Sequence, residues 1–233
     1  MHSKELNERS PLRLLEQSIH GGLGRGNLGV VAAPAGVGKT AFLVGVALDD
    51  LMRGRKVLHI AVDEPVEKIR DYYDEIFMDL ARSSNLEDAC NERLKMERNR
   101  NIHTYRGNTF SVARLREAIA FLQIHMQFSP ESLIIEGFNF EKTTVEELEG
   151  LRQVAREING ELWMSAVTAL QPATAEHAIP EPVARVAGAF DVILSMRPGR
   201  GVVHLHLLKD HDNPEVSASH VALDPTTLLL VSE

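Results

Sequence analysis

The sequence contains a single cysteine, Cys90, among 233 residues. One cysteine cannot form a disulfide within the chain, so a disulfide-built scaffold is excluded and a reducing compartment is expected. No stretch approaches the roughly 18 consecutive apolar residues that a membrane-spanning helix needs. Residues 1–13 also lack the apolar segment of a secretory signal. We therefore expect a cytoplasmic protein that has no membrane partner.

Basic residues are in the minority, because 25 Lys and Arg face 33 Asp and Glu, for a formal net charge of −8. A protein that binds nucleic acid through phosphate contacts is typically basic, so the acidic net charge argues against such binding by the protein as a whole. It does not exclude a local basic surface. The apolar share of 44% and the charged share of 25% exclude an intrinsically disordered or collagen-like chain. The length predicts one domain, at residues 13–233, after a flexible leader at residues 1–12.

Apolar runs of strand length alternate with segments of helical periodicity. This alternation predicts an α/β fold with a mainly parallel sheet flanked by helices. Thr144 and Glu147 have the spacing of a capping box, and residues 83–100 form a polar, partly helical excursion. Three later strand-like segments predict a C-terminal antiparallel β extension. The expected strands are 27–32, 56–62, 102–105, 132–136, 162–168, 191–196, 202–208 and 217–231, and the expected helices are 40–53, one from Pro65, one near 112–122 and one after Thr144.

The segment 33–40 (APAGVGKT) follows an expected strand and opens an expected helix, which is the setting of a Walker A motif. Its glycines allow backbone N–H groups to face a phosphate. Lys39 can reach the terminal phosphates, and the Thr40 hydroxyl can ligate Mg²⁺. The first motif position is Ala33 instead of glycine, and the alternative is a chance glycine-rich turn. The sequence thus predicts ATP and Mg²⁺ as ligands, with nucleotide-binding residues Pro34, Ala35, Gly36, Val37, Gly38, Lys39, Thr40 and Ala41.

Two carboxylates, Asp63 and Glu64, directly follow the expected strand at 56–62. In a parallel α/β sheet, ligands bind at the carboxyl ends of the strands. A carboxylate there can orient or deprotonate the water that attacks a γ-phosphate. Because both residues precede Pro65, the alternative is that they cap the next helix, whose N-terminus favours anions.

Residues 20–69 resemble the RecA-like ATPases of the DnaB, RadA and KaiC families. The resemblance is carried by HGGL at 20–23, by Arg25-Gly26, by APAGVGKT and by VLHIAVDEPVEKI at 57–69. It implies a RecA-like P-loop NTPase fold and a homo-oligomeric ring or filament with nucleotide between neighbouring subunits. It also places Asp63 on the position of the catalytic glutamate, one methylene shorter, with Glu64 beside it.

The resemblance weakens toward the C-terminus but implies two further roles near the nucleotide. Glu136 takes the place of the Walker B aspartate that holds the Mg²⁺ water shell in these families, and a longer side chain can still reach that shell. The alternative is a buried strand that ends in an incidental charge. Thr168 matches the polar sensor position near the γ-phosphate.

The segment 207–214 (LLKDHDNP) resembles the one that carries the trans-acting lysine and arginine finger of these families. Lys209 and His211 are therefore expected to face the nucleotide of the next subunit. A neutral histidine cannot supply the permanent charge of a guanidinium. Either turnover is slow, or Arg197 or Arg200 takes the place of the finger, or catalysis is not the purpose.

His204 and His206 alternate on an expected strand and so share one face. Together with His211 they could ligate a metal, but no cysteine joins them, and a surface-facing pair is favoured.

A nucleic-acid motor is disfavoured by the loops that face DNA in the translocating relatives. Residues 169–181 contain no Lys or Arg, and residues 137–149 contain only Lys142, whereas phosphate tracking needs such residues. Phe138 and Phe140 could stack on bases, although both could equally belong to the core. The basic residues at 25, 53–55 and 93–100 are interpreted as solvated surface.

Three functions follow as hypotheses. The first is a slow ATPase that acts as an oligomerising regulatory or assembly switch in the manner of KaiC. The second is a DNA-dependent ATPase, a helicase or recombination accessory, in the manner of DnaB or RadA. The third is a catalytically degenerate nucleotide-binding scaffold for a protein partner. The Glu136 and His211 departures favour the first and third.

Overall fold

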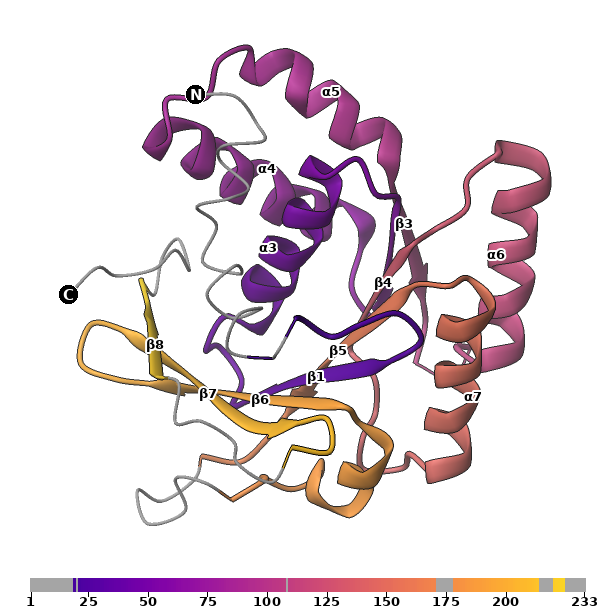
Figure 1. Ribbon diagram of the computed structural model, residues 1–233, viewed down its shortest axis with the longest axis vertical. Helices are drawn as coiled ribbons and strands as arrows, with labels where there is room; N and C mark the ends of the chain where they lie inside the picture. The colour runs from indigo at the N-terminus through magenta and orange to yellow at the C-terminus, as the bar shows by residue number, and fades with distance from the viewer. Residues whose placement is uncertain (1–18, 20, 108, 171–177, 214–219, 225–233) are drawn as a thin grey trace.

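The computed structural model describes residues 19, 21–107, 109–170, 178–213 and 220–224 (Figure 1). Within them, eight strands form one sheet in the order β3-β2-β4-β5-β1-β6-β7-β8. The strands are β1 (Leu28–Ala33), β2 (Val57–Val62), β3 (Arg100–Tyr105), β4 (Ser132–Glu136), β5 (Glu161–Val167), β6 (Val192–Pro198), β7 (Val203–Asp210) and β8 (His220–Leu223). The helices are α3 (Lys39–Met52), α4 (Val66–Ser83), α5 (Ala89–Asn99), α6 (Val112–Met126), α7 (Val145–Glu157) and the 3₁₀ helix η2 (Ala184–Ala189).

The sheet is parallel from β3 to β6, and β7 and β8 add an antiparallel pair. The mainly parallel α/β architecture is therefore confirmed. The prediction that the antiparallel extension begins at 191–196 is wrong, because β6 pairs in parallel with β1 along Gly29–Ala32. The chain returns through η2 to the amino end of the sheet before β6 starts, so antiparallel pairing begins only at β7.

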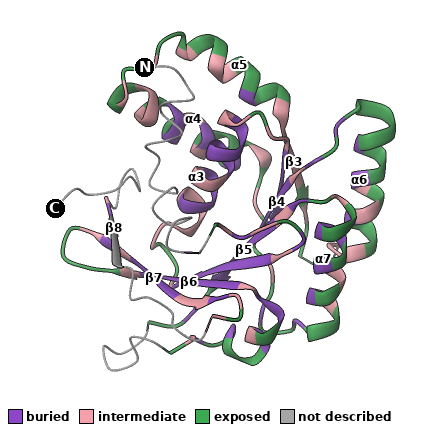
Figure 2. Cartoon of the chain, viewed as in Figure 1, coloured by how far each residue is buried: buried purple, intermediate pink, exposed green. Residues whose placement is uncertain are grey.

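Alternating side chains of the strands feed two separate apolar cores, one on each face. In β1, Val31 and Ala33 pack on the side of α3 and α4, whereas Val30 and Ala32 pack on the side of α6 and α7. Figure 2 shows the central strands buried between helices whose outward faces are exposed. Because both faces are covered, the central strands are mostly apolar, as parallel strands of this class are, with a few buried polar residues among them.

Capping side chains set the starts of α6 and α7. The Thr144 hydroxyl accepts a hydrogen bond from the backbone N–H of Glu147 (3.2 Å), as the capping spacing predicts. Pro65 is the N-cap of α4, one position earlier than its expected place as the first helical residue. In the polar excursion, α5 buries only Met96, so the expected exposed and partly helical character is confirmed.

The two edges of the sheet are occupied by different candidate residues. The carboxyl ends of β1, β2, β4 and β5 share one edge. β7 runs against β6, with Lys209 opposite Ile193 and Asp210 opposite Val192, so β7 ends at the other edge.

In the described part of the chain, no helix has the length and apolarity to cross a bilayer. Residues 1–12, expected as a leader, and most of 217–231 lie outside the described residues.

Candidate functional site

The 33–40 loop connects β1 to α3 at the carboxyl edge of the sheet. Gly36 (φ 79°) and Gly38 (φ 102°) both adopt left-handed backbone conformations that a side chain would strain. A Cβ atom on Gly36 would meet nothing within 4 Å, so backbone conformation and not crowding calls for glycine there. The loop is partly exposed, and α3 starts directly after Gly38. Backbone N–H groups and the positive end of α3 are therefore accessible to an anion.

Lys39 lies against its own loop. Its ammonium donates hydrogen bonds to the carbonyl oxygens of Ala33 (3.0 Å) and Pro34 (2.9 Å). Burial lowers the pKa of Lys39, and the nearby carboxylate of Glu136 opposes that shift. An ammonium has three N–H donors, so one is left for a phosphate without breaking either contact.

Thr40 and Glu136, the two predicted Mg²⁺ ligands, lie together. The Thr40 hydroxyl donates a 2.6 Å hydrogen bond to Oε2 of Glu136, although the residues are 96 positions apart. The other carboxylate oxygen, Oε1, is buried and has no hydrogen-bond partner among the described residues. A buried charged oxygen without such a partner is costly. A hydroxyl and a carboxylate with a spare oxygen form the hard oxygen donor set that Mg²⁺ prefers.

No cluster of three or more His, Cys, Asp or Glu side chains within the described residues could hold a metal ion by itself. Mg²⁺ is usually bound through one or two protein oxygens together with substrate phosphates and water, and the Thr40 hydroxyl and the Glu136 carboxylate are oxygen donors of that kind.

Asp63 and Glu64 follow β2, the strand beside β4, but have different surroundings. Asp63 adopts a left-handed conformation (φ 62°), and its Oδ1 accepts a hydrogen bond from the N–H of Gly107 (2.7 Å). A Cβ on Gly107 would lie 2.6 Å from Oδ2 of Asp63, which explains the glycine. Glu64 instead pairs with Lys68 (2.8 Å). The N-cap of α4 is Pro65, so neither carboxylate occupies the capping position itself.

A cavity of about 570 Å³, which the sequence did not reveal, opens beside Asp63. Its lining includes Phe110, Phe138, Lys142 and Glu147. Edge-to-face contacts join Phe138 to Phe110 and to Phe140 (centroids 5.9 and 5.4 Å apart). Phe140 is only 3% exposed and belongs to the core, so of the two expected base-stacking candidates only Phe138 reaches this cavity.

Thr168, the expected sensor, follows β5 next to the loop. Its backbone N–H donates to the carbonyl of Ala33 (3.0 Å), one of the carbonyls that also accepts from Lys39. Thr168 therefore lies beside the start of the 33–40 loop.

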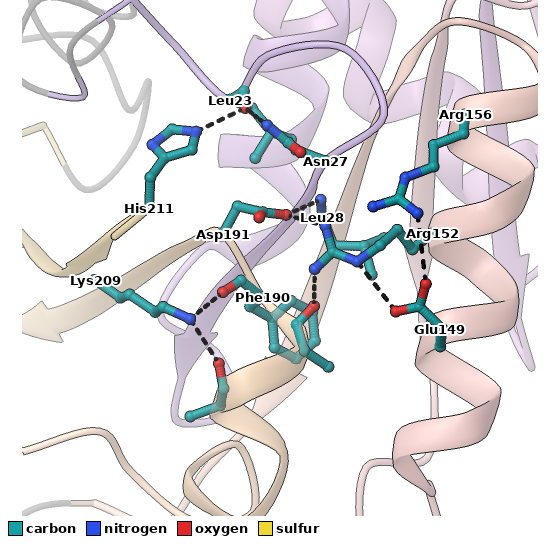
Figure 3. Close-up of polar contacts among 12 residues, drawn as sticks. Leu23, Asn27, Leu28, Glu149, Arg152, Arg156, Phe190, Asp191, Lys209 and His211 are labelled. Atoms are coloured by element: carbon teal, nitrogen blue, oxygen red, sulfur yellow. Dashed lines mark hydrogen bonds and ion pairs between the residues drawn. The ribbon is translucent and has the colours of Figure 1, made fainter. Parts of the chain in front are cut away.

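Lys209 and His211 lie at the amino edge of the sheet, where both are engaged within the chain (Figure 3). The Lys209 ammonium donates to the carbonyls of Phe190 and Ala187. His211 contacts the Leu23 carbonyl through Nε2 (3.0 Å) and Asp210 Oδ1 through Nδ1 (2.9 Å). Burial lowers the pKa of His211, but these two hydrogen bonds outweigh it and the pKa is raised overall.

The remaining basic and histidine candidates lie along the β6–β7 hairpin. Arg197 is opposite His204, and Arg200 is exposed in the turn, at the same edge as the 33–40 loop. The rings of His204 and His206 share a face, with centroids 6.2 Å apart. His206 is only 7% exposed, so the expected surface-facing pair is wrong for this residue.

Sequence reasoning missed two polar residues. His59, in the middle of β2, is fully buried, and its Nε2 lies 3.3 Å from Oε1 of Glu136. The signal was a single polar residue inside VLHIAV. Asp191 was not considered a site residue, but its Oδ2 accepts hydrogen bonds from the Leu28 N–H (2.9 Å) and from Arg152 (2.7 Å), as Figure 3 shows. These contacts tie α7 to the amino ends of β1 and β6.

Neither a scan against models of known protein families nor a search of curated proteins returns a match to this sequence.

Proposed function

We propose that this chain is a RecA-like P-loop ATPase that binds ATP with Mg²⁺ and hydrolyses it slowly, as an oligomerising regulatory or assembly switch. The observation that carries the proposal is the 2.6 Å contact between the Thr40 hydroxyl and Glu136. It brings a strand-end carboxylate to the first turn of a helix that follows a loop with two left-handed glycines. This combination suits the phosphates and the metal of a nucleotide.

In this proposal, residues of the 33–40 loop hold the phosphates through backbone N–H groups, and Lys39 adds a charge at the β- and γ-phosphates. Thr40 and Glu136 hold the Mg²⁺. When bound, the ion neutralises charge on the phosphate oxygens. Thr168 stands beside the loop as a polar sensor.

Asp63 orients the attacking water and accepts its proton through Oδ2, because Oδ1 is already bonded to Gly107. Glu64 is turned toward Lys68 and is the weaker candidate. Two features make turnover slow. First, only Oδ2 of Asp63 can act on the water, since the Gly107 N–H occupies Oδ1. Second, position 211 carries an imidazole, whereas the families that this chain resembles have a guanidinium there.

Lys209 and His211 lie at the edge of the sheet opposite the 33–40 loop, so any contact they make with nucleotide has to be with that of a second copy. Both must first leave their intrachain partners, the carbonyls of Phe190 and Leu23 among them. An assembly step that exchanges these contacts fits a switch better than a constantly active motor. Arg200, which is exposed at the loop's own edge, is the alternative source of a guanidinium.

The test is phosphate release with Mg²⁺ and ATP, with and without single-stranded DNA, together with the molecular mass in ATP and in ADP. Slow, DNA-indifferent turnover and ATP-dependent assembly support the switch. Lys39→Ala should abolish turnover, whereas Lys95→Ala, an exposed lysine of α5, should not. Turnover that DNA stimulates would replace the switch with the motor. ATP binding without phosphate release would leave the degenerate scaffold for a protein partner.

A further inference from the structure

His59 is the single polar residue of β2, whose six residues are all buried. An imidazole removed from water destabilises the fold unless its nitrogens find polar partners. The position therefore needs an explanation that packing alone does not supply, since valine or isoleucine suits a buried parallel strand better.

Tyr73 of α4 provides the partner of one ring nitrogen. Its hydroxyl lies 3.1 Å from Nδ1 of His59, and the two rings meet edge to face. Complete burial raises the pKa of Tyr73, so the phenol keeps its proton. The guanidinium of Arg100 lies over the Tyr73 ring, 4.4 Å from its centroid, and adds a further contact that holds the ring in place.

Glu136 faces the other nitrogen, with Oε1 3.3 Å from Nε2 of His59. Neither atom has a hydrogen-bond partner among the described residues, so this approach is an ion-pair distance and not a hydrogen bond. A carboxylate oxygen cannot face a nitrogen lone pair without repulsion, so Nε2 carries the proton. Nδ1 is then the acceptor of the Tyr73 hydroxyl.

We propose that His59, held by Tyr73, is a positioning residue that orients Glu136 for the Mg²⁺ of the bound nucleotide. This inference rests on the proposed function. A small rotation aligns Nε2–H with Oε1, while Oε2 stays with Thr40. Metal-binding groups are commonly fixed by hydrogen bonds of this kind from residues behind them.

The register of β2 and β4 explains why a glutamate suits this place. Ala61 is the Cα partner of Glu136, and His59 lies two residues earlier on the same face. Ala61 contributes only a methyl group, which leaves room for the carboxylate to approach the imidazole.

The test compares ADP affinity in Mg²⁺ with ADP affinity in EDTA, and the ratio of the two measures the metal-dependent part of binding. His59→Phe should lower this ratio about 10- to 100-fold and leave the affinity in EDTA unchanged. His59→Gln should restore much of the affinity ratio that His59→Phe loses, because the glutamine amide N–H can occupy the place of Nε2. His59→Asn, whose amide falls near Nδ1, should not. His103→Phe is the matched control, since His103 pairs with Ile60 and so points to the other face.

A purely structural role would lower the melting temperature of His59→Phe without changing the ratio, and that result would overturn the inference alone. A wild-type chain that binds no nucleotide would overturn the proposed function, and this inference with it. Nitrogen NMR of the wild-type imidazole does not depend on any variant folding. It should show the Nε2–H tautomer, and an Nδ1–H tautomer would contradict the assignment.

Discussion

The Thr40 hydroxyl donates a 2.6 Å hydrogen bond to Oε2 of Glu136, across 96 residues of sequence. Thr40, the second residue of α3, supplies the donor, and Glu136, the last residue of β4, supplies the carboxylate. The sequence predicted both as ligands of the same ion, and the fold brings them to the same point. The contact leaves Oε1 buried without a hydrogen-bond partner among the described residues, and Nε2 of His59 lies 3.3 Å from it.

Removing the charge of Glu136 should separate metal binding from nucleotide binding. Glu136→Gln keeps the size and an acceptor for Thr40, but its amide is a poor Mg²⁺ ligand. We expect nucleotide affinity in Mg²⁺ to fall about 10- to 100-fold, and affinity in EDTA to stay constant or rise, because a negative charge near the phosphates is gone. Calorimetric titration measures both. Glu157→Gln, at an exposed pair with Arg116, is the control and should change neither.

Asp63→Asn should affect turnover and not binding. The amide cannot accept a proton from water, so phosphate release should fall about 100- to 10,000-fold while the Kd for ATP stays within a few-fold of the wild-type value. Glu64→Gln should have little effect, since Glu64 is partly exposed and paired with Lys68. Equal losses in the two variants would show that Asp63 is not the principal base.

Arg152→Ala should destabilise the fold without touching the nucleotide site. Arg152 is buried, with 8% exposure, and bonds to Asp191 and to the Ala189 carbonyl. Removing it leaves a half-buried carboxylate without its cation, and loss of one partner of a buried pair costs about 3–5 kcal/mol. Urea unfolding measures this loss. Arg156→Ala, whose exposed pair with Glu149 is visible in Figure 3, should cost at most about 1 kcal/mol.

His211 should make stability depend on pH. Its pKa is raised in the folded chain, so protonation favours folding. The stabilisation is complete below the unfolded pKa of about 6.5 and is lost as the pH rises through the folded pKa. We therefore expect the stability difference between wild type and His211→Gln to be larger near about pH 5.5 than near about pH 8.5. Denaturant unfolding at both values measures it, and a difference that grows with pH would contradict the assigned shift.

Much of the fold could be predicted because local patterns and tertiary structure agree. The apolar runs at 57–62 and 132–136 are strands, and Thr144 caps α7, since each depends on nearby residues. The direction of β6 was mispredicted, because a mostly apolar run of strand length (DVILSM at 191–196) does not encode which neighbour it will pair with. That depends on where η2 returns the chain.

The candidate site could be predicted at the 33–40 loop, where spacing itself sets the geometry. His59 could not be assigned a role, because its meaning depends on the register between β2 and β4 and on Tyr73 from α4. Similarly, the intrachain contacts of Lys209 and His211 depend on carbonyls supplied by distant segments. Contacts of this kind leave no spacing signature in the sequence.

In the proposed function, the 33–40 loop binds the phosphates of ATP with Mg²⁺. The decisive measurement is a calorimetric titration of ATP in Mg²⁺ into wild type, Lys39→Ala and Lys95→Ala. We expect one site per chain in wild type and Lys95→Ala, and a loss of affinity of about 100-fold or more in Lys39→Ala, because a charged hydrogen-bond donor to phosphate is removed. Absence of binding in wild type, or equal affinity in Lys39→Ala, would contradict it.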